Sequence, residues 1–222
     1  NSWYDEISMG YATPQGTAQF TPYAKYGTHA AYFDGSSSAQ LVNQTLLNGL
    51  SQCSMMCFVR FRAFQTGAGL VTARGSQKNG LSQHGSIAGR VAFYVNNGAV
   101  SGNTTLETNR WYFVVGTYDR FVTPQFSLYL NGQLDNTYAQ DRGNVSQYDY
   151  FRLAWDDAAS RSAADIDEVA IFNRALTEGE IESISERALA SIGFRLRSSS
   201  TNVLTGDFLG PSGATNDYFI TE

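Results

Sequence analysis

The feature that most constrains this chain is a series of short strand-like runs separated by turn signals, which continues from about residue 29 to about residue 173. Typical runs are "CFVRFRAF", "RVAFYVNNG" and "RWYFVVGTYD". Asn131-Gly132 in "YLNGQL" predicts a two-residue hairpin, and "VNNGAV" predicts a second one. Helices do not alternate with these runs, so a parallel sheet is not indicated. The pattern predicts an all-β, antiparallel β-sandwich of the jelly-roll type.

A single convincing helix follows the last strand-like run, from Thr177 to about Ala190. Thr177 is suited to cap it, and Glu180 can reach back to the backbone N–H of Thr177, which makes a capping box. Leu176 precedes the cap and can pack on Ile181 as a hydrophobic staple. The sequence therefore predicts one short helix on the C-terminal side of the sandwich.

Composition narrows the class of protein. The 222 residues are 14% aromatic and only 16% charged, which favours sheets joined by tight turns in one domain. The net charge of −5 gives no basic footprint for nucleic acid. No run approaches the roughly 18 apolar residues that a membrane-spanning helix needs, so membrane insertion is not expected.

The two cysteines, Cys53 and Cys57, lie within one strand-like run. In a continuous strand, residues four apart are separated by about 13 Å and cannot form a disulfide. We predict two buried free thiols that act as small hydrophobic side chains. A bulge at Ser54-Met55 would allow a disulfide, which remains the alternative.

Four stretches occur in an order that is typical of one known family. "KYGTHAAYFDGSSSAQLV" comes first, "NRWYFVVGTYDR" with "FSLYLNGQL" follows, and "IDEVAIFNRALTEGEI" comes last. In this order they resemble the laminin-G-like jelly-roll modules of the concanavalin A-like lectin/glucanase superfamily, over about Gly27 to Ile184. The resemblance also implies that Trp111 packs in the core.

The resemblance implies a domain organisation. We expect a laminin-G-like jelly-roll domain at residues 25–192, preceded by an N-terminal extension at residues 1–24. Residues 193–222 are rich in Ser, Thr and Gly and fall outside the family pattern, so we expect them to form a C-terminal arm or tail.

Catalysis is not expected. Hydrolases of this superfamily carry Glu-x-Asp-x-x-Glu on one strand, whereas this chain has Asp165-x-Asp167-Glu168. Asp167 and Glu168 point to opposite faces of a strand, so they cannot flank one glycosidic bond. Asp165 is expected at an exposed strand start, and Asp167 with Arg174 is expected to tie the strand to the following turn. No catalytic residue is assigned.

Two kinds of binding site are expected. Pentraxins hold calcium at one rim of the sandwich, and the resemblance implies metal ligands at Asp156 and Asp157, whose carboxylates suit calcium. A solvated acidic turn is the alternative. Sugar binding needs an exposed aromatic platform beside planar polar groups, and Trp155, Tyr148 and Tyr150 are the candidate ligand-binding residues.

The leading functional hypothesis is a non-enzymatic laminin-G-like module for adhesion or recognition on an extracellular or virion surface. A glycan or glycoprotein is the expected ligand, and the chain is expected to act as a homo-oligomer or as part of a larger assembly. The alternative is a structural subunit of a virion, fibre or filament whose termini join neighbours. A glycoside hydrolase or lyase is the third hypothesis.

Overall fold

The computed structural model describes residues 3–4, 11–42, 46–148, 150–156 and 160–189. The chain divides into two compact units, Asn1–Ser185 and Glu186–Glu222. The first unit holds all the described strands. In the second unit, only the end of one helix is described.

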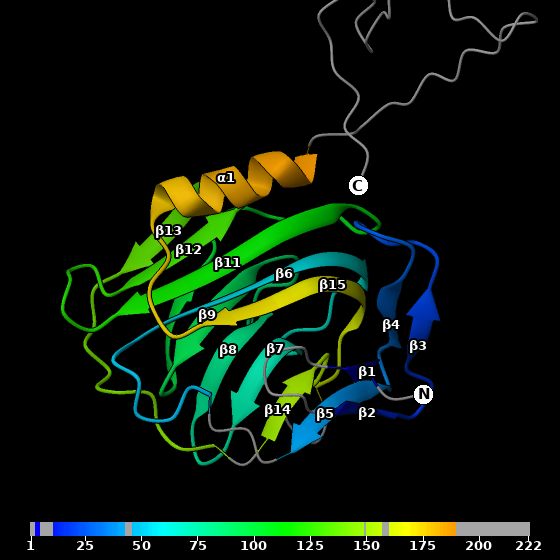
Figure 1. The fold of residues 1–222 in the computed structure, drawn as a ribbon, viewed down its shortest axis with the longest axis horizontal. Coiled ribbons are helices and arrows are strands. Elements are labelled where there is room, and N and C mark those ends of the chain that lie inside the picture. The colour runs from blue at the N-terminus through cyan, green and yellow to red at the C-terminus, as the bar shows by residue number, and fades with distance from the viewer. Residues whose placement is uncertain (1–2, 5–10, 43–45, 149, 157–159, 190–222) are drawn as a thin grey trace, which may run out of the picture. The chain divides into compact units, whose positions relative to one another are not determined.

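The first unit consists of two antiparallel sheets that share one hydrophobic core (Figure 1). In spatial order, the eight-stranded sheet contains β1 (Trp3–Tyr4), β2 (Tyr11–Gln15), β5 (Ser38–Val42), β14 (Tyr150–Leu153), β7 (Gly69–Arg74), β8 (Lys78–Gln83), β9 (Val91–Val95) and β10 (Gly98–Ser101). The seven-stranded sheet contains β13 (Gln133–Tyr138), β12 (Phe126–Leu130), β11 (Trp111–Asp119), β6 (Gln52–Ala63), β15 (Ala163–Phe172), β4 (Ala30–Asp34) and β3 (Gln19–Thr21). The predicted antiparallel sandwich is confirmed.

The core forms because alternate residues of each strand face the opposite sheet. Along β6, the inward-facing side chains of the core are Cys53, Met55, Cys57, Val59 and Phe61. The thiols of Cys53 and Cys57 are free, and burial raises the pKa of each to about 12. The prediction of two buried free thiols is confirmed.

The two sheets approach closely where Gly116 of β11 meets Phe93 of β9. A Cβ added to Gly116 would lie 2.1 Å from Phe93 Cγ, so only glycine fits at this position. The core is therefore closely packed at its centre.

Both predicted hairpins are present. Asn131 and Gly132 join β12 to β13 with φ values of 52° and 84°, the left-handed conformation that a type I′ turn requires. Asn96 and Asn97 join β9 to β10 in the same way, with φ values of 49° and 63°.

The helix α1 (Glu178–Leu189) begins with the predicted capping box. The Thr177 N–H donates to Glu180 Oε2 at 2.9 Å, and the Glu180 N–H donates to Thr177 Oγ1 at 3.4 Å. Leu176 and Ile181 are both buried, as a hydrophobic staple requires. The hydroxyl of Ser54 on β6 fixes the preceding turn, because it accepts from the Leu176 N–H at 2.9 Å.

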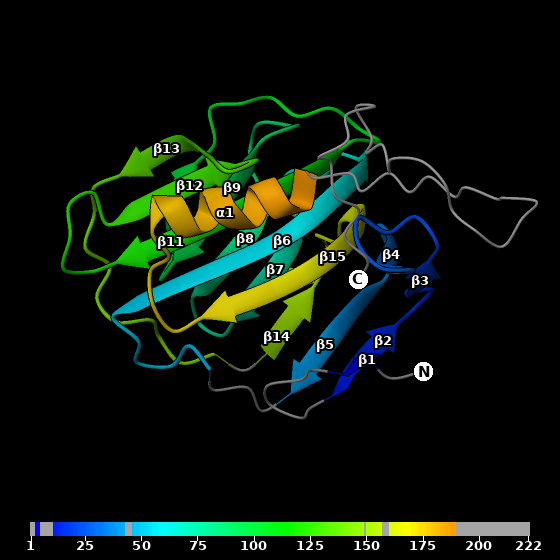
Figure 2. The same cartoon turned by 45° about the horizontal axis from the view of Figure 1, so that its top comes forward.

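The first turns of α1 cover the outer face of the seven-stranded sheet (Figures 1 and 2). Ser185 lies against the β12–β13 hairpin, where a Cβ added to Gly132 would be 2.7 Å from Ser185 Cβ. Apolar side chains on this outer face are buried although they lie outside the main core; among them are Met56, Phe113 and Val115. The helix thus closes an apolar patch that the sheet alone would expose.

The described part of residues 1–24, expected to be an N-terminal extension, pairs with strands of the sandwich. β2 pairs with β5, and β3 pairs with β4, so these residues supply strands to both sheets. The expected arm at residues 193–222 lies outside the described residues.

The expectation for Trp111 is wrong. Tyr112 and Val114 of β11 face the core, so Trp111 points to the opposite side of the sheet and is only half-buried.

Asp167 does not pair with Arg174. It accepts from the backbone N–H groups of Lys25 at 2.8 Å and Tyr26 at 3.0 Å.

No helix within the described ranges combines the length and the apolar character needed to span a membrane.

Candidate functional site

Strand β14 and the segment that follows it carry most of the expected binding residues. Phe151 belongs to the core and Leu153 packs against it, so Tyr150 and Arg152 point to the outer face of the eight-stranded sheet. Tyr150 is exposed, whereas Arg152 is almost fully buried. The two side chains begin a polar and aromatic surface that also includes Trp155 and Arg161.

Arg152 lies against two aromatic rings. Its guanidinium carbon is 4.1 Å from the centroid of the Tyr150 ring and 3.6 Å from that of Trp155. The guanidinium carbon of Arg161 is 4.5 Å from the same Trp155 ring, and a β-bridge joins the backbones of Trp155 and Arg161. We refer to Tyr150, Arg152, Trp155 and Arg161 as the aromatic–arginine stack. Cation–π contacts of this kind hold planar groups at fixed separations.

Hydrogen bonds fix the orientation of Arg152 in the stack. Its Nε donates to Gln40 Oε1 of β5 at 3.0 Å, and its Nη1 donates to the carbonyl oxygen of Asp156 at 3.2 Å. Burial lowers the pKa of the Arg152 guanidinium, because desolvation disfavours the charged form. The lowered pKa still leaves arginine charged at neutral pH.

Asp156 is buried beside two cations. Lys78 Nζ lies 2.6 Å from Asp156 Oδ2, and Arg74 Nη1 lies 3.5 Å from Asp156 Oδ1. Lys78 Nζ also lies 4.1 Å from the centroid of the Tyr94 ring. Burial, followed by the charge of Asp156, raises the pKa of the Tyr94 phenol.

The Asp156 carboxylate, one of the two expected calcium ligands, is occupied by cationic side chains in this structure. A calcium ligand must direct its oxygens at the ion together with several other oxygen donors. Here the carboxylate faces Lys78 and Arg74 instead. The second expected ligand, Asp157, lies outside the described residues, and within the described ranges no three acidic, His or Cys side chains gather as a metal site.

The backbone after β14 lies directly on the sheet. The Thr72 hydroxyl donates to the Trp155 carbonyl at 2.5 Å, and the Ser162 hydroxyl donates to the Gly69 carbonyl at 2.6 Å. A Cβ on Gly69 would lie 2.5 Å from the Trp155 carbonyl carbon and oxygen, so the close approach requires glycine. These contacts hold Trp155 in position over β7.

The β9–β10 hairpin positions Lys78 from the other side. The Lys78 N–H donates to Asn97 Oδ1 at 2.8 Å, and the Asn97 N–H donates to the Lys78 carbonyl at 3.1 Å. The Asn96 N–H donates to Asn79 Oδ1 at 2.8 Å. The start of β8 is therefore fixed by asparagine side chains as well as by the sheet.

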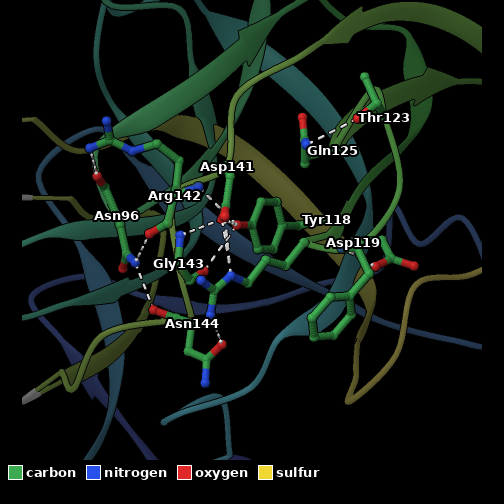
Figure 3. A network of polar contacts seen from close by, with 11 residues as sticks. Asn96, Tyr118, Asp119, Thr123, Gln125, Asp141, Arg142, Gly143 and Asn144 are labelled. Atoms are coloured by element: carbon green, nitrogen blue, oxygen red, sulfur yellow. Dashed lines mark hydrogen bonds and ion pairs between the residues drawn. The ribbon is translucent and has the colours of Figure 1, made fainter.

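The same hairpin anchors the loop between β13 and β14 (Figure 3). Asn96 Nδ2 donates to the carbonyls of Arg142 and Asn144, each at 2.8 Å. The Tyr118 hydroxyl donates to the Gly143 carbonyl at 2.9 Å and accepts from the Arg142 N–H at 3.0 Å. Burial raises the pKa of Tyr118, so its phenol remains protonated and able to donate. This network stabilises the rim of the sandwich from which β14 starts.

The structure separates the three expected aromatic residues. Tyr150 and Trp155 join the aromatic–arginine stack, but Tyr148 is buried in the core, where its hydroxyl accepts from the Leu47 N–H at 3.3 Å. Tyr148 precedes β14 rather than lying on it, so the alternation that placed it beside Tyr150 does not apply. Tyr148 is therefore not part of the surface.

Sequence reasoning missed the arginines of the stack. The run "YFRL" contains a usable signal, because residues two apart on a strand share a face, which places Arg152 beside Tyr150. Arg161, Lys78 and Gln40 come from other elements and gave no local signal.

The carboxylates of β15 are engaged in structural contacts. Asp165 is fully buried and pairs with Arg60 and Arg62 at 2.6 and 2.9 Å, so the expectation of an exposed strand start is wrong. Asp167 accepts from backbone N–H groups, and Glu168 is exposed with a φ of 47°. Both aspartates therefore have structural partners.

The chain belongs to the concanavalin A-like lectin/glucanases superfamily, whose laminin-G-like family model matches residues 33–182. No curated protein matches the sequence. The expected family is thus confirmed over most of the sandwich.

Solved structures of low identity share the fold. Domain 4 of an extracellular arabinanase from Geobacillus stearothermophilus, in complex with arabinotriose, superposes with a TM-score of 0.65 at 17% identity, over 79% of this chain and 88% of that domain. Trypanosoma rangeli sialidase in complex with the inhibitor DANA gives a TM-score of 0.62 at 19% identity, over 83% of this chain and 30% of the sialidase. The binding domain of botulinum neurotoxin serotype G gives 0.58 at 15% identity, over 80% of this chain and 46% of that domain. The chain thus spans less than half of the sialidase and neurotoxin chains.

Proposed function

We propose that this chain is a non-enzymatic carbohydrate-binding module for adhesion or recognition on an extracellular or virion surface. The observation that carries the proposal is the aromatic–arginine stack of Tyr150, Arg152, Trp155 and Arg161 on the outer face of the eight-stranded sheet. The arabinanase domain that shares the fold binds arabinotriose, which supports a sugar ligand.

The stack offers the two kinds of contact that a sugar needs. Aromatic rings pack against the apolar face of a sugar ring, and fixed N–H donors bond to its oxygens. Arg161 Nε is buried and makes no hydrogen bond to any described residue, so the Arg161 guanidinium has hydrogen-bonding capacity that these residues leave unused. Gln40 holds Arg152 in place, which reduces the entropy lost on binding.

The charge of the stack favours acidic sugars. Neither Arg152 nor Arg161 forms an ion pair with a carboxylate of the described residues. A sugar carboxylate or sulfate would supply the missing anion and can bond to a guanidinium through two parallel hydrogen bonds. We therefore expect acidic oligosaccharides to bind more tightly than neutral ones.

A glycan array that contains acidic and neutral oligosaccharides tests the proposal, and calorimetric titration of the best ligand follows. Trp155→Ala should weaken binding at least tenfold, because it removes the ring that both arginines contact. Phe121→Ala is the matched control, since Phe121 is an exposed aromatic residue on the β11–β12 loop. Absence of binding to every glycan, or equal affinity for wild type and Trp155→Ala, would overturn the proposal. Release of reducing sugar from a bound glycan would contradict its non-enzymatic part.

The proposal includes a homo-oligomer or larger assembly joined through residues 193–222. The Ser-, Thr- and Gly-rich composition of these residues supports this part of the proposal, because such a segment has few apolar side chains with which to form a core of its own. Light scattering during size exclusion should show an oligomer of the full chain. A monomer at all concentrations would contradict this part.

A further inference from the structure

The outer face of the seven-stranded sheet carries a row of planar side chains that the proposed function does not use. Trp111 of β11 pairs with Arg60 of β6, Arg60 pairs with Asp165 of β15, and Asp165 pairs with Tyr32 of β4. Directly paired residues point to the same side of an antiparallel sheet. The four side chains therefore form one line across four strands, and Trp111 and Tyr32 lie three strand spacings, or about 14 Å, apart.

A buried carboxylate fixes two arginines in this row. Asp165 Oδ2 accepts from Arg60 Nε at 2.7 Å and pairs with Arg60 Nη2 at 2.6 Å. Asp165 Oδ1 accepts from Arg62 Nε at 3.2 Å and from Arg62 Nη2 at 2.9 Å. Each guanidinium thus uses one edge to bind Asp165, and the Nη1 group of each makes no hydrogen bond within the part of the chain that the structure describes. The cluster carries two positive charges against one negative charge.

Aromatic rings surround the two arginines. The guanidinium carbon of Arg60 lies 5.1 Å from the centroid of the Tyr23 ring and 6.0 Å from that of Trp111. The guanidinium carbon of Arg62 lies 4.5 Å from the centroid of the Tyr32 ring. Three aromatic side chains and two planar cations therefore make one composite surface, which we call the Tyr23–Trp111 face.

The Tyr23–Trp111 face is exposed to solvent, whereas a cluster that served only to stabilise the fold would be covered. Tyr23 is 62% exposed, and Trp111 and Tyr32 are only half-buried. The segment that holds Tyr23 is anchored by backbone contacts, since the N–H groups of Lys25 and Tyr26 donate to Asp167. The chain thus keeps a large aromatic side chain in water at a fixed place, although burying it would be favourable.

We propose that the Tyr23–Trp111 face is a second carbohydrate-binding surface that takes an acidic polysaccharide chain laid across the strands. Exposed rings stack on sugar rings along the row, and the Nη1 groups of Arg60 and Arg62 donate to sugar hydroxyls and carboxylates. The surplus positive charge favours a polymer that bears carboxylates. The aromatic–arginine stack lies on the other sheet, so one module binds two polysaccharide chains and bridges them.

The test uses the full chain with sodium polygalacturonate and alginate as acidic probes, and arabinan and xylan as neutral probes. Three proteins are compared with wild type: Tyr23→Ala with Trp111→Ala, Trp155→Ala, and the combination of all three substitutions. Calorimetry with an oligomer of the best probe gives the number of sites per chain, and turbidity with the polymer reports cross-linking. Thermal melts confirm that each variant is folded, and Tyr23→Phe with Trp111→Phe is the conservative control that keeps the rings.

We expect two sites per wild-type chain and cross-linking of an acidic polymer. Tyr23→Ala with Trp111→Ala should leave one site per chain and reduce the cross-linking at least tenfold. Tyr23→Phe with Trp111→Phe should retain most of the wild-type cross-linking. Two sites retained in Tyr23→Ala with Trp111→Ala, or tight binding restricted to the neutral probes, would overturn the second surface. If Trp155→Ala changes nothing while Tyr23→Ala with Trp111→Ala abolishes binding, the second surface stands, but the proposed site at the stack and the bridging of two chains fail. If no probe binds wild type, both fail.

Discussion

Lys78 Nζ lies 2.6 Å from Asp156 Oδ2, and both side chains are buried on the outer face of the eight-stranded sheet. Such a pair is costly to break because removal of one partner leaves a buried charge without its counter-ion. Asp156→Ala should therefore lower the free energy of unfolding by about 3 kcal/mol in a urea titration. The paired change Lys78→Met with Asp156→Leu should recover most of the loss. Equal unfolding free energies for Asp156→Ala and wild type would show that the pair does not stabilise the fold.

The same pair bears on calcium. If Asp156 and Asp157 were calcium ligands, millimolar calcium would raise the melting temperature, because an ion that binds only the folded protein stabilises it. Since the Asp156 carboxylate already faces Lys78 and Arg74, we expect equal melting curves with calcium and with chelator. A rise that disappears in Asp156→Ala with Asp157→Ala would establish the metal site instead.

The start of α1 gives a ranked series of stability changes. Ile181→Ala should cost about 2–4 kcal/mol, because it deletes a fully buried side chain at the first turn of the helix. Thr177→Ala should cost about 1 kcal/mol, the usual loss for a helix cap. Glu180→Ala should cost less, because Glu180 is solvent-accessible and water can replace it at the Thr177 N–H. Denaturant titration of the three variants measures the order, and a neutral Ile181→Ala would show that the helix does not pack on the sheet.

Glu180 also predicts a pH dependence. Its pKa is lowered to about 2, first by the Arg174 guanidinium and then by the Thr177 N–H and hydroxyl. A carboxylate whose pKa falls on folding stabilises the folded state above its unfolded pKa, and this stabilisation is lost as the pH falls towards the folded value. The stability difference between wild type and Glu180→Gln should thus be full at pH 6 and shrink towards pH 2. Denaturant titrations across this range measure it, with Glu182→Gln as the control for loss of one helical carboxylate, and a constant difference would contradict the assignment.

Gly116 offers a test of the core. Gly116→Ala places a methyl group where Phe93 Cγ would be 2.1 Å away, so either the ring or the sheets must move. Overpacking of this kind should lower the free energy of unfolding by at least about 1–3 kcal/mol. Gly179→Ala is the control, because an added Cβ there meets no atom within 4 Å. Equal stability of Gly116→Ala and wild type would show that the core is loosely packed at this point.

The sequence by itself determined the features that depend on residues close together in the chain. Asn131-Gly132 specified its hairpin because both residues adopt positive φ, and Thr177 with Glu180 specified the helix start through contacts three residues apart. The extended backbone of β6 keeps Cys53 and Cys57 too far apart for a disulfide, so both remain free thiols. Each of these follows from backbone geometry over a few residues.

Only the tertiary structure decided which aromatic residues reach the surface and what the charged groups contact. Trp111 lies on the outer face rather than in the core, because the face that a strand residue occupies depends on how its strand pairs with its neighbours. Tyr148 is buried rather than exposed, because it precedes β14 and does not follow the alternation of that strand. Asp156 meets Lys78, and Asp165 meets Arg60, across strands that are distant in the sequence. Strand pairing is non-local, and a one-residue change of register turns every side chain to the other face. For that reason, the pairing of strands decides which side chains from distant parts of the sequence meet at the two proposed binding surfaces.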